Sequence, residues 1–420
     1  MNRKFLLVFV ALMALGVLAV PGFAQDGEVG IAHYFSGDLN LPTLLQIFSN
    51  FNEATGLTVV DNPIGHEDFK TGIPASIAAG NLPDVFSYWA GARTQFAVDA
   101  GALLPIDEYW DAAGLDEIVP ASVANSSTLY NGSRYLVPFN IHYAGFFYNP
   151  KVWAEAGIDV PDTWDGLLEA FAEFEMKGID PVALGSQNSW PAQFWFDYLL
   201  LRTAGPDYRS DLMTGAASYE DAEVVRAMEL WQSLVDSGYF VDNANAYNWT
   251  DAADMVANGD AAVTLMGTWI GGYWKGQGLT PGEDYDFFVF PAIEEGVPQA
   301  VVGPVDGWVM TIYSNPDEAW QLLNFFISDV ETQSLWNSSY GSLSPNNQVD
   351  SSIYDVVAAK AGDTIANASH YVFNYDLATP PQVDHCGLTM FQAFMNDPSS
   401  VTEHLADTQE CAAEGFASIN

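Results

Sequence analysis

The stretch Gly80-Asn81-Leu82-Pro83-Asp84-Val85-Phe86-Ser87-Tyr88 joins a turn to a run of strand-forming residues. Its glycine and proline end a helix that is predicted to reach Ala79, and residues 84–88 then form a buried strand. The same order occurs upstream, where a short strand at 29–35 precedes a helix with apolar residues at helical spacing and a second strand at 57–60. This alternation predicts an α/β fold in which helices cover a mostly parallel sheet.

Three aromatic residues stand at the ends of predicted strands. They are Tyr34, Trp89 and Trp269, the last of which follows an apolar strand at 261–266. Ligands of open α/β sheets bind outside the carboxyl ends of the strands. We therefore expect these three side chains to face a binding cleft.

The first residues have the pattern of a secretory signal peptide. Arg3 and Lys4 precede an apolar run at 5–20, and Pro21-Gly22-Phe23-Ala24 follows with small residues at the expected cut. We expect the signal peptide to span residues 1–24. Because no cysteine stands at the cleavage site, a lipid anchor has no acceptor there, and we expect an exported protein in the periplasm or outside the cell.

The charge of the chain excludes several partners. The sequence has 12 Lys and Arg against 54 Asp and Glu, a formal net charge of −42. Such a charge repels nucleic acid and anionic lipid headgroups. After the signal peptide, no apolar run approaches the roughly 18 to 20 residues that a spanning helix needs. We expect neither nucleic-acid binding nor stable membrane insertion, and a hydrophobic content of 49% predicts a globular chain.

Cys386 and Cys411 are the two cysteines of the chain. In an exported protein such a pair is more often bridged than free. We therefore expect a disulfide, which would close the loop between them with a stabilisation of roughly 3 kcal/mol or more. Two buried thiols are the alternative.

Several short motifs occur in an order that resembles a known family. They are Leu82-Pro83-Asp84-Val85, Arg134-Tyr135-Leu136-Val137-Pro138-Phe139-Asn140, Phe147-Tyr148-Asn149-Pro150, Pro161-Asp162-Thr163-Trp164-Asp165, Asn258-Gly259-Asp260-Ala261-Ala262 and Pro304-Val305-Asp306-Gly307-Trp308. This ordered set resembles the family 1 extracellular solute-binding proteins of ABC sugar importers. Asn140-Ile141-His142, Trp249 and Met266-Gly267-Thr268-Trp269 are most similar to the branch that binds glucose and related sugars.

The resemblance implies a two-lobed, type II periplasmic-binding-protein-like fold whose lobes are joined by crossover hinge segments. Residues 25–138 and 291–336 would form the N-terminal lobe, and residues 139–290 and 337–420 the C-terminal lobe. It also implies a monomer that needs no cofactor and catalyses no reaction. Such a protein captures a mono- or oligosaccharide between its lobes and delivers it to the permease subunits of an ABC importer.

A sugar presents hydroxyls at its edge and apolar C–H faces, so a selective cleft needs flat aromatic rings and fixed polar groups. The aromatic residues that we expect at the cleft are Tyr34, Trp89, Trp190, Trp249, Trp269 and Tyr340. Among them, Trp269 matches the family motif and follows a strand, which favours a stacking role.

Five polar residues complete the expected site. Asp38 lies in the loop after the first strand, where the family commonly contacts its ligand, and Asp306 matches a carboxylate that binds sugar hydroxyls. Asn140 and His142 stand at the first crossover, where they either bind the ligand or serve the hinge. Gln193 opens a helix and has an amide that would bond a hydroxyl.

The sequence departs from the glucose-binding branch at two positions. Leu39 follows Asp38 where that branch usually has a second acidic residue, and Tyr340 stands where it usually has a basic one. The identity of the sugar and its length therefore stay open.

Two other functions stay open beside sugar binding. A glycoside hydrolase needs a pair of carboxylates, and a chain with this many acidic residues contains such pairs. However, no nucleophile-elbow, zinc-protease or phosphate-loop motif is present, and the histidines are scattered singly, which predicts no metal site. A binding protein for another solute, such as a polyamine or a peptide, is the second alternative.

Overall fold

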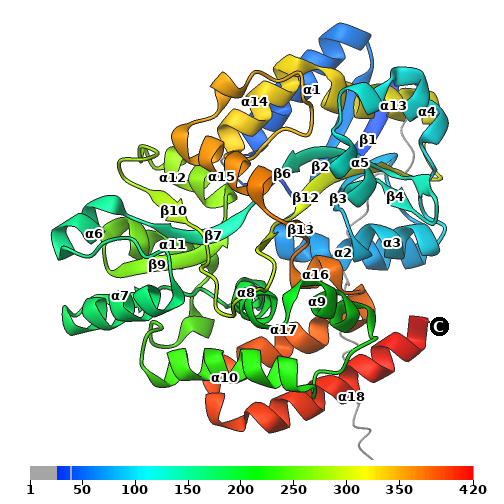
Figure 1. Cartoon of the computed structure of the whole chain (residues 1–420). Coiled ribbons are helices and arrows are strands. Elements are labelled where there is room, and N and C mark those ends of the chain that lie inside the picture. Colours follow the sequence, from blue (N-terminus) through cyan, green and yellow to red (C-terminus); the bar gives the residue numbers. More distant parts are fainter. Residues whose placement is uncertain (1–25, 38–39, 420) are drawn as a thin grey trace, which may run out of the picture.

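The computed structural model describes residues 26–37 and 40–419. The predicted signal peptide and the predicted site residue Asp38 lie outside the described residues. Two mixed sheets and their helices form two lobes, with the first lobe at the upper right of Figure 1 and the second at the left and below. Each lobe has its own hydrophobic core.

The first lobe is built on a five-stranded sheet in the order β2-β1-β3-β12-β6. Its strands are β1 (Glu28–His33), β2 (Thr58–Pro63), β3 (Val85–Trp89), β6 (Leu136–Ile141) and β12 (Val305–Met310). β1 pairs in parallel with β2 and β3, whereas β12 is antiparallel to both β3 and β6. Every residue of β3 is buried, as expected for a central strand with both faces covered.

The second lobe contains a four-stranded sheet in the order β10-β7-β9-β8. Its strands are β7 (Ala144–Tyr148), β8 (Asp180–Val182), β9 (Ala261–Gly267) and β10 (Asp286–Phe288). β7 is antiparallel to both neighbours, and β8 is parallel to β9. In each sheet one strand therefore opposes the direction that the others share, so both sheets are mixed, and the expected α/β architecture is confirmed.

Helices cover both sheets, and their bounds fall as follows. The helices of the first lobe are α1 (Leu41–Thr55), α2 (His66–Ala79), α3 (Ala92–Asp99), α4 (Asp107–Ala113), α5 (Ala121–Ser127), α13 (Pro316–Ser328) and α14 (Val330–Tyr340). The remaining helices are α6 (Pro150–Ala156), α7 (Trp164–Met176), α8 (Gln193–Thr203), α9 (Gly205–Thr214), α10 (Ala222–Asp236), α11 (Trp249–Asn258), α12 (Trp269–Gly276), α15 (Val356–Asn367), α16 (Tyr375–Ala378), α17 (Pro381–Asn396) and α18 (Val401–Ile419).

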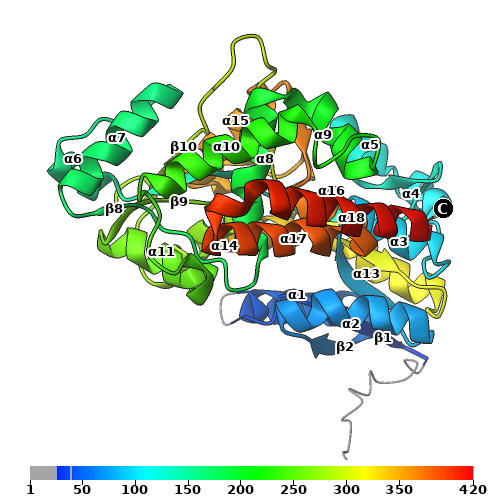
Figure 2. The same cartoon turned by 90° about the horizontal axis from the view of Figure 1, so that it is seen from below.

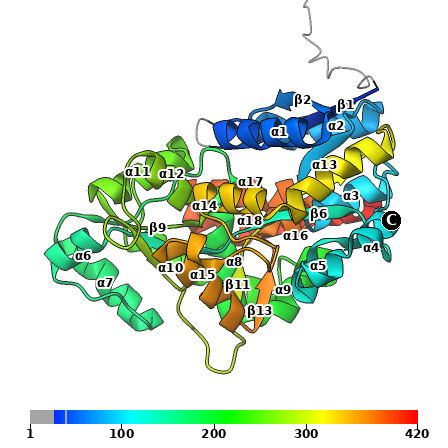
Figure 3. The same cartoon turned by 90° about the horizontal axis from the view of Figure 1, so that it is seen from above.

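The chain passes between the lobes at three places. β6 ends at Ile141 in the first sheet and β7 begins three residues later in the second. The return runs from β10 to β12, and the third passage follows α14, which contacts both α1 and α12 (Figure 3). Leu343, just beyond α14, pairs with Ile141. The passages therefore lie side by side, as a hinge requires.

Two short ladders complete the fold. β11 (Ala300–Val302) pairs in parallel with β13 (His370–Val372), and the side chains of β11 belong to the core of the second lobe. β4 (Leu129–Tyr130) pairs with β5 (Ser133–Arg134) as a hairpin. The division of the chain into lobes at the exact residues given above stays a prediction.

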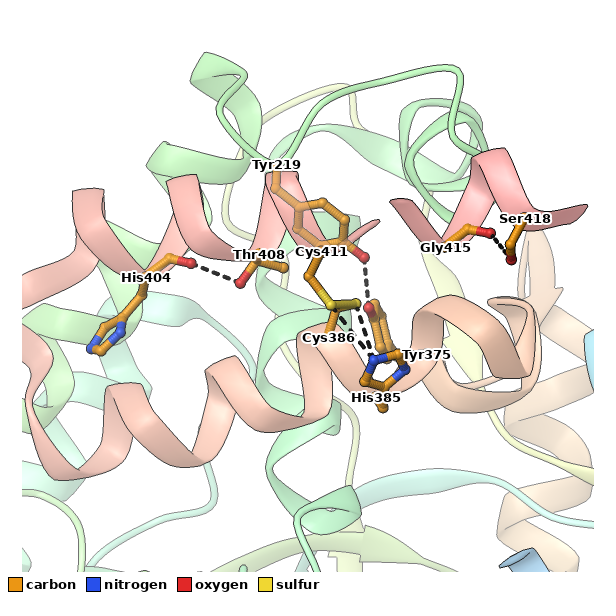
Figure 4. Close-up of a disulfide and its surroundings, with 9 residues drawn as sticks. All are labelled: Tyr219, Tyr375, His385, Cys386, His404, Thr408, Cys411, Gly415 and Ser418. Carbon is orange, nitrogen blue, oxygen red and sulfur yellow. Dashed lines mark hydrogen bonds between the residues drawn. A yellow bond between two sulfur atoms is a disulfide. The ribbon is translucent and has the colours of Figure 1, made fainter. Parts of the chain in front are cut away.

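The C-terminal helices α17 and α18 lie against each other, and α18 also contacts α10 (Figure 2). Cys386 in α17 and Cys411 in α18 form a disulfide with a Cα–Cα distance of 5.9 Å, so the alternative of two thiols is wrong (Figure 4). Among the described helices, none combines the length and apolarity that a membrane crossing demands.

Candidate functional site

A cavity of about 520 Å³ lies between the lobes, and both lobes supply its walls. It gathers most of the predicted site residues: Tyr34, Trp89, Trp190, Gln193, Trp249, Trp269, Asp306 and Tyr340. Asn140 and His142 are not part of its lining. The position of Asp38 is not described, although Ser36, Gly37 and Asn40 of the same loop line the cavity.

One wall is formed by aromatic rings at the ends of two adjacent parallel strands. Tyr34 follows β1 and Trp89 ends β3, and their rings stack at a centroid distance of 4.5 Å. His66 places its ring edgewise against both. Tyr34 is 8% exposed and Trp89 is 5% exposed, so these rings form a tightly packed wall with only a small accessible face.

The second lobe supplies further tryptophans. Trp269 begins α12 directly after β9, and Trp190 lies in a 3-10 helix (Trp190–Ala192) with its ring 5.9 Å from that of Trp269. The Trp269 ring lies over Gly267, where an added Cβ would come within 1.9 Å of a ring carbon. Trp249 is the first residue of α11, which Asn248 and Asp251 start with a capping box. The aromatic residues of the second lobe are thus fixed by strand and helix ends.

Asp306 is the central acidic residue of the cavity. It lies on β12, is 2% exposed, and accepts a hydrogen bond at Oδ2 from Asn140 Nδ2 at 2.6 Å. Trp336 Nε1 in turn donates to Asn140 Oδ1 at 2.9 Å. Burial raises the pKa of Asp306 to about 6, which leaves it mainly ionised at neutral pH. Asn140 therefore orients the carboxylate from behind the cavity wall.

His142 also stands behind this wall. Its Nδ1 shares a hydrogen bond of 2.7 Å with Thr268 Oγ1, and its Nε2 lies 3.7 Å from Asp306 Oδ2. Burial lowers the pKa of His142 to about 3, so the ring is neutral at pH 7. The hydrogen bond to Thr268 joins the first crossover to the residue before α12. This contact agrees with the hinge alternative for His142.

The first turn of α2 contributes polar residues beyond those expected from the sequence. These residues are His66, Glu67, Asp68 and Lys70. His66 Nδ1 donates to Glu67 Oε1 at 2.8 Å, and burial lowers the pKa of His66. α2 begins only three residues after β2, so the rule that ligands bind beyond strand ends applies to this turn as well. That signal was present in the sequence.

A second missed group comes from the C-terminal part of the chain. Asn374 and Asp376 line the cavity, and Lys70 Nζ lies 2.6 Å from Asp376 Oδ2. The backbone N–H of Asp376 donates to Gln193 Oε1 at 2.9 Å. α16 is only four residues long and reaches the cavity through tertiary packing, so local sequence contains no signal for it.

Several buried polar atoms of the cavity lining have no hydrogen-bond partner among the described residues. They are Tyr34 Oη, Asp306 Oδ1, Asn374 Oδ1, Gln193 Nε2 and Trp190 Nε1. Leaving a buried donor or acceptor unpaired costs about 1 to 3 kcal/mol. A ligand with both donors and acceptors would satisfy all five.

Two α/β lobes with a polar and aromatic cavity between them define a class of proteins that bind small solutes. A family model described as bacterial extracellular solute-binding protein matches residues 39–333. The chain belongs to this family.

Relatives match over most of the chain. An uncharacterized ABC transporter extracellular-binding protein of Pyrococcus horikoshii is 27% identical over 100% of this chain and 96% of its own length. A xylose/arabinose-binding protein of Haloferax volcanii is 25% identical over 87% of this chain and 78% of its length. A probable sugar-binding periplasmic protein of Mesorhizobium japonicum is 27% identical over 62% of this chain and 66% of its length.

Solved structures share the fold. The bacterial solute receptor AcbH, described as having an exclusive preference for β-D-galactopyranose, superposes with a TM-score of 0.84 at 24% identity, over 94% of this chain and 100% of that one. A chitin oligosaccharide binding protein has a TM-score of 0.84 at 22% identity, over 93% of this chain and 99% of that one. The expected two-lobed fold is confirmed.

Proposed function

We propose that this chain is an exported binding protein that captures a sugar in the cavity between its lobes and delivers it to an ABC importer. The observation that carries the proposal is the combination of unpaired buried polar atoms with tryptophan rings in one cavity. Sugars match this combination because hydroxyls occupy their edges and C–H groups occupy their faces. The relatives named for sugars, among them the xylose/arabinose-binding protein, support the same ligand class.

In this proposal each lobe supplies part of the contacts with the sugar. Trp269 and Trp190 of the second lobe stack on the sugar. Asp306 of the first lobe accepts a hydrogen bond from a sugar hydroxyl at its unpaired Oδ1. Gln193 Nε2 donates to the ligand and Asn374 Oδ1 accepts from it. Because a ligand with partners in both lobes stabilises the closed form, the importer has a signal that the protein is loaded.

We assign the predicted site residues on the same basis. Tyr34, Trp89, Trp249 and Tyr340 shape the walls, and Asp38 belongs to a loop whose described residues reach the cavity. Asn140 and His142 act through Asp306 and the hinge. The protein works as a monomer and releases the sugar chemically unchanged.

A cationic solute such as a polyamine is the second candidate. Glu67, Asp68, Asp306 and Asp376 line the cavity together with one lysine, Lys70, which is paired with Asp376. This excess of carboxylates would attract positive charge. The rings of Trp190 and Trp269, which meet edge to face, nevertheless favour a ligand with flat apolar faces.

A thermal-shift screen of the mature protein tests the ligand class. Its panel holds mono- and oligosaccharides, with amino acids, peptides and polyamines as controls. A ligand at 100 times its dissociation constant stabilises the folded protein by about 2.7 kcal/mol, which raises the unfolding midpoint measurably. We expect a shift with at least one sugar that is recovered intact. A shift with a polyamine alone, or consumption of a glycan, would contradict the proposal.

A further inference from the structure

Two ion pairs link the lobes away from the three crossovers. Lys70 of α2 lies 2.6 Å from Asp376, and Arg93 Nη2 of α3 lies 2.6 Å from Asp384 Oδ2 in α17. Arg93 also lies 4.0 Å from Asp376. The four side chains are between 3% and 12% exposed, so these are buried pairs.

The acidic side of these pairs is anchored to the second lobe. The backbone N–H of Tyr375 donates to Asp197 Oδ2 at 2.9 Å, and Arg209 Nη2 donates to Phe373 O at 2.7 Å. Asp197 and Arg209 themselves form a buried ion pair. The segment around α16 is thereby fixed to α8 and α9, and it carries Asp376 toward the first lobe.

The same segment touches the backbone of the first lobe directly. Gly91 precedes α3 with a φ of +98°, and an added Cβ there would lie 2.4 Å from Leu377 O. Arg93, two residues later, lies over the ring of Trp89 in the cavity wall at 5.7 Å. Such a close approach exists only while the lobes are together, so these contacts belong to the closed form.

The charges favour this arrangement at Asp376. Burial by itself raises its pKa, but Lys70 and Arg93 outweigh burial and hold the pKa of Asp376 below its usual value. Both cations come from the first lobe. The ionised Asp376 is therefore stabilised by cross-lobe partners.

We propose that the ion pairs Lys70–Asp376 and Arg93–Asp384 form a latch between the lobes that raises the affinity for the ligand. Arg93 is a positioning residue in this latch, because it holds Asp376 in the cavity wall without touching the ligand. The inference rests on the proposed function. The latch increases the fraction of ligand-free protein in the closed, binding-competent form, and the apparent dissociation constant falls in proportion to that fraction.

The test compares Arg93→Met with a matched control, Arg134→Met. Arg134 pairs with Asp116 and lies over Trp110, all within the first lobe, so the control makes the same chemical change away from the lobe contact. Small-angle scattering of the ligand-free proteins measures the radius of gyration, and stopped-flow fluorescence measures association and dissociation rates for the sugar found in the screen.

We expect Arg93→Met to have a larger ligand-free radius of gyration and a roughly tenfold higher dissociation constant, mainly through faster dissociation. Arg93→Lys, which keeps the charge, should recover most of the affinity. An unchanged radius and unchanged rates in Arg93→Met would overturn the latch.

Two safeguards keep the test decisive. If Arg93→Met does not fold, the ligand-free radius of gyration of Lys70→Met decides, and a value equal to that of the unmodified protein overturns the proposal. If no sugar binds even the unmodified protein, the proposed function fails, yet the scattering comparison still tests the latch independently.

Discussion

Asp306 shows how one residue acquires a binding role from its surroundings. The strand β12 places it opposite Asn140 on β6, and Asn140 occupies only one of its two carboxylate oxygens. The other oxygen faces a cavity and lacks a partner within the described part of the chain. Burial raises its pKa, so its charge changes within an accessible pH range.

We expect sugar affinity to fall as the pH decreases through about 6, the pKa of Asp306. Protonation removes a charge-assisted acceptor for a sugar hydroxyl, and such hydrogen bonds are about twice as strong as neutral ones. Calorimetric titrations between pH 5 and pH 8 measure the slope of the sugar affinity against pH. In Asp306→Asn the affinity should be lower at pH 7 and this part of the slope should vanish. Equal slopes in both proteins would contradict the assigned role.

The contribution of Asp306 to the stability of the ligand-free protein should change with pH in the direction opposite to its contribution to sugar affinity. Its pKa is raised in the folded state from 3.8 to about 6, so the folded state binds the proton more tightly. The stabilising contribution is therefore fully present below about pH 4 and is lost as the pH rises through about 6. Asp384, whose pKa burial raises to about 7, contributes in the same direction and persists in Asp306→Asn.

The sequence predicted the cavity residues at strand ends better than those that tertiary packing brings to the cavity. Tyr34, Trp89 and Trp269 lie in the cavity, as the strand-end rule indicated. Asn140 and His142 were also candidates for the cavity lining, but they lie behind the residues that line it, because a residue at a crossover can face either side of the strand. Asp376 was missed because its contact with Lys70 joins positions that are 306 residues apart.

Among the elements, strands with a clear apolar run were predicted, but the one strand of each sheet that runs against the others was not. β1, β2, β3 and β9 fall where the apolar runs occur. The antiparallel direction of β12 and β7 depends on the passage of the chain between lobes, which no local pattern records. Of the helices, the four-residue α16 is too short for a periodic signal, although it carries cavity residues.

At the scale of elements, the disulfide joins α17 to α18 and should stabilise the second lobe. Cys386 and Cys411 are 25 residues apart, and closing such a loop removes chain entropy worth about 3 to 4 kcal/mol. We expect a reducing agent to lower the thermal unfolding midpoint of the protein. The double variant Cys386→Ala with Cys411→Ala should unfold at a lower temperature and show no response to the reductant. An equal midpoint with and without reductant in the unmodified protein would contradict this expectation.

The molecule as a whole combines a strongly acidic chain with an acidic cavity, in which four carboxylates stand beside one lysine, Lys70. The net charge of −42 is spread over the chain, while Lys70 and Arg93, two of only 12 basic residues, are committed to the contact between the lobes. These two cations therefore lie where the two lobes meet, whereas other basic residues, such as Lys151 and Arg209, pair with carboxylates of their own lobe.

The most direct test of this account is calorimetric titration of the sugar found in the screen into the unmodified protein, Trp269→Ala and Trp320→Ala. Trp320 is a matched control because it stacks on Tyr109 in the first lobe, outside the cavity. We predict one binding site per chain. In Trp269→Ala the free energy of binding should be weaker by about 1 to 3 kcal/mol, while the unfolding midpoint of the ligand-free protein stays nearly unchanged. Trp320→Ala should bind the sugar with the affinity of the unmodified protein. Binding by Trp269→Ala as tight as that of the unmodified protein would contradict the claim that this cavity holds the sugar.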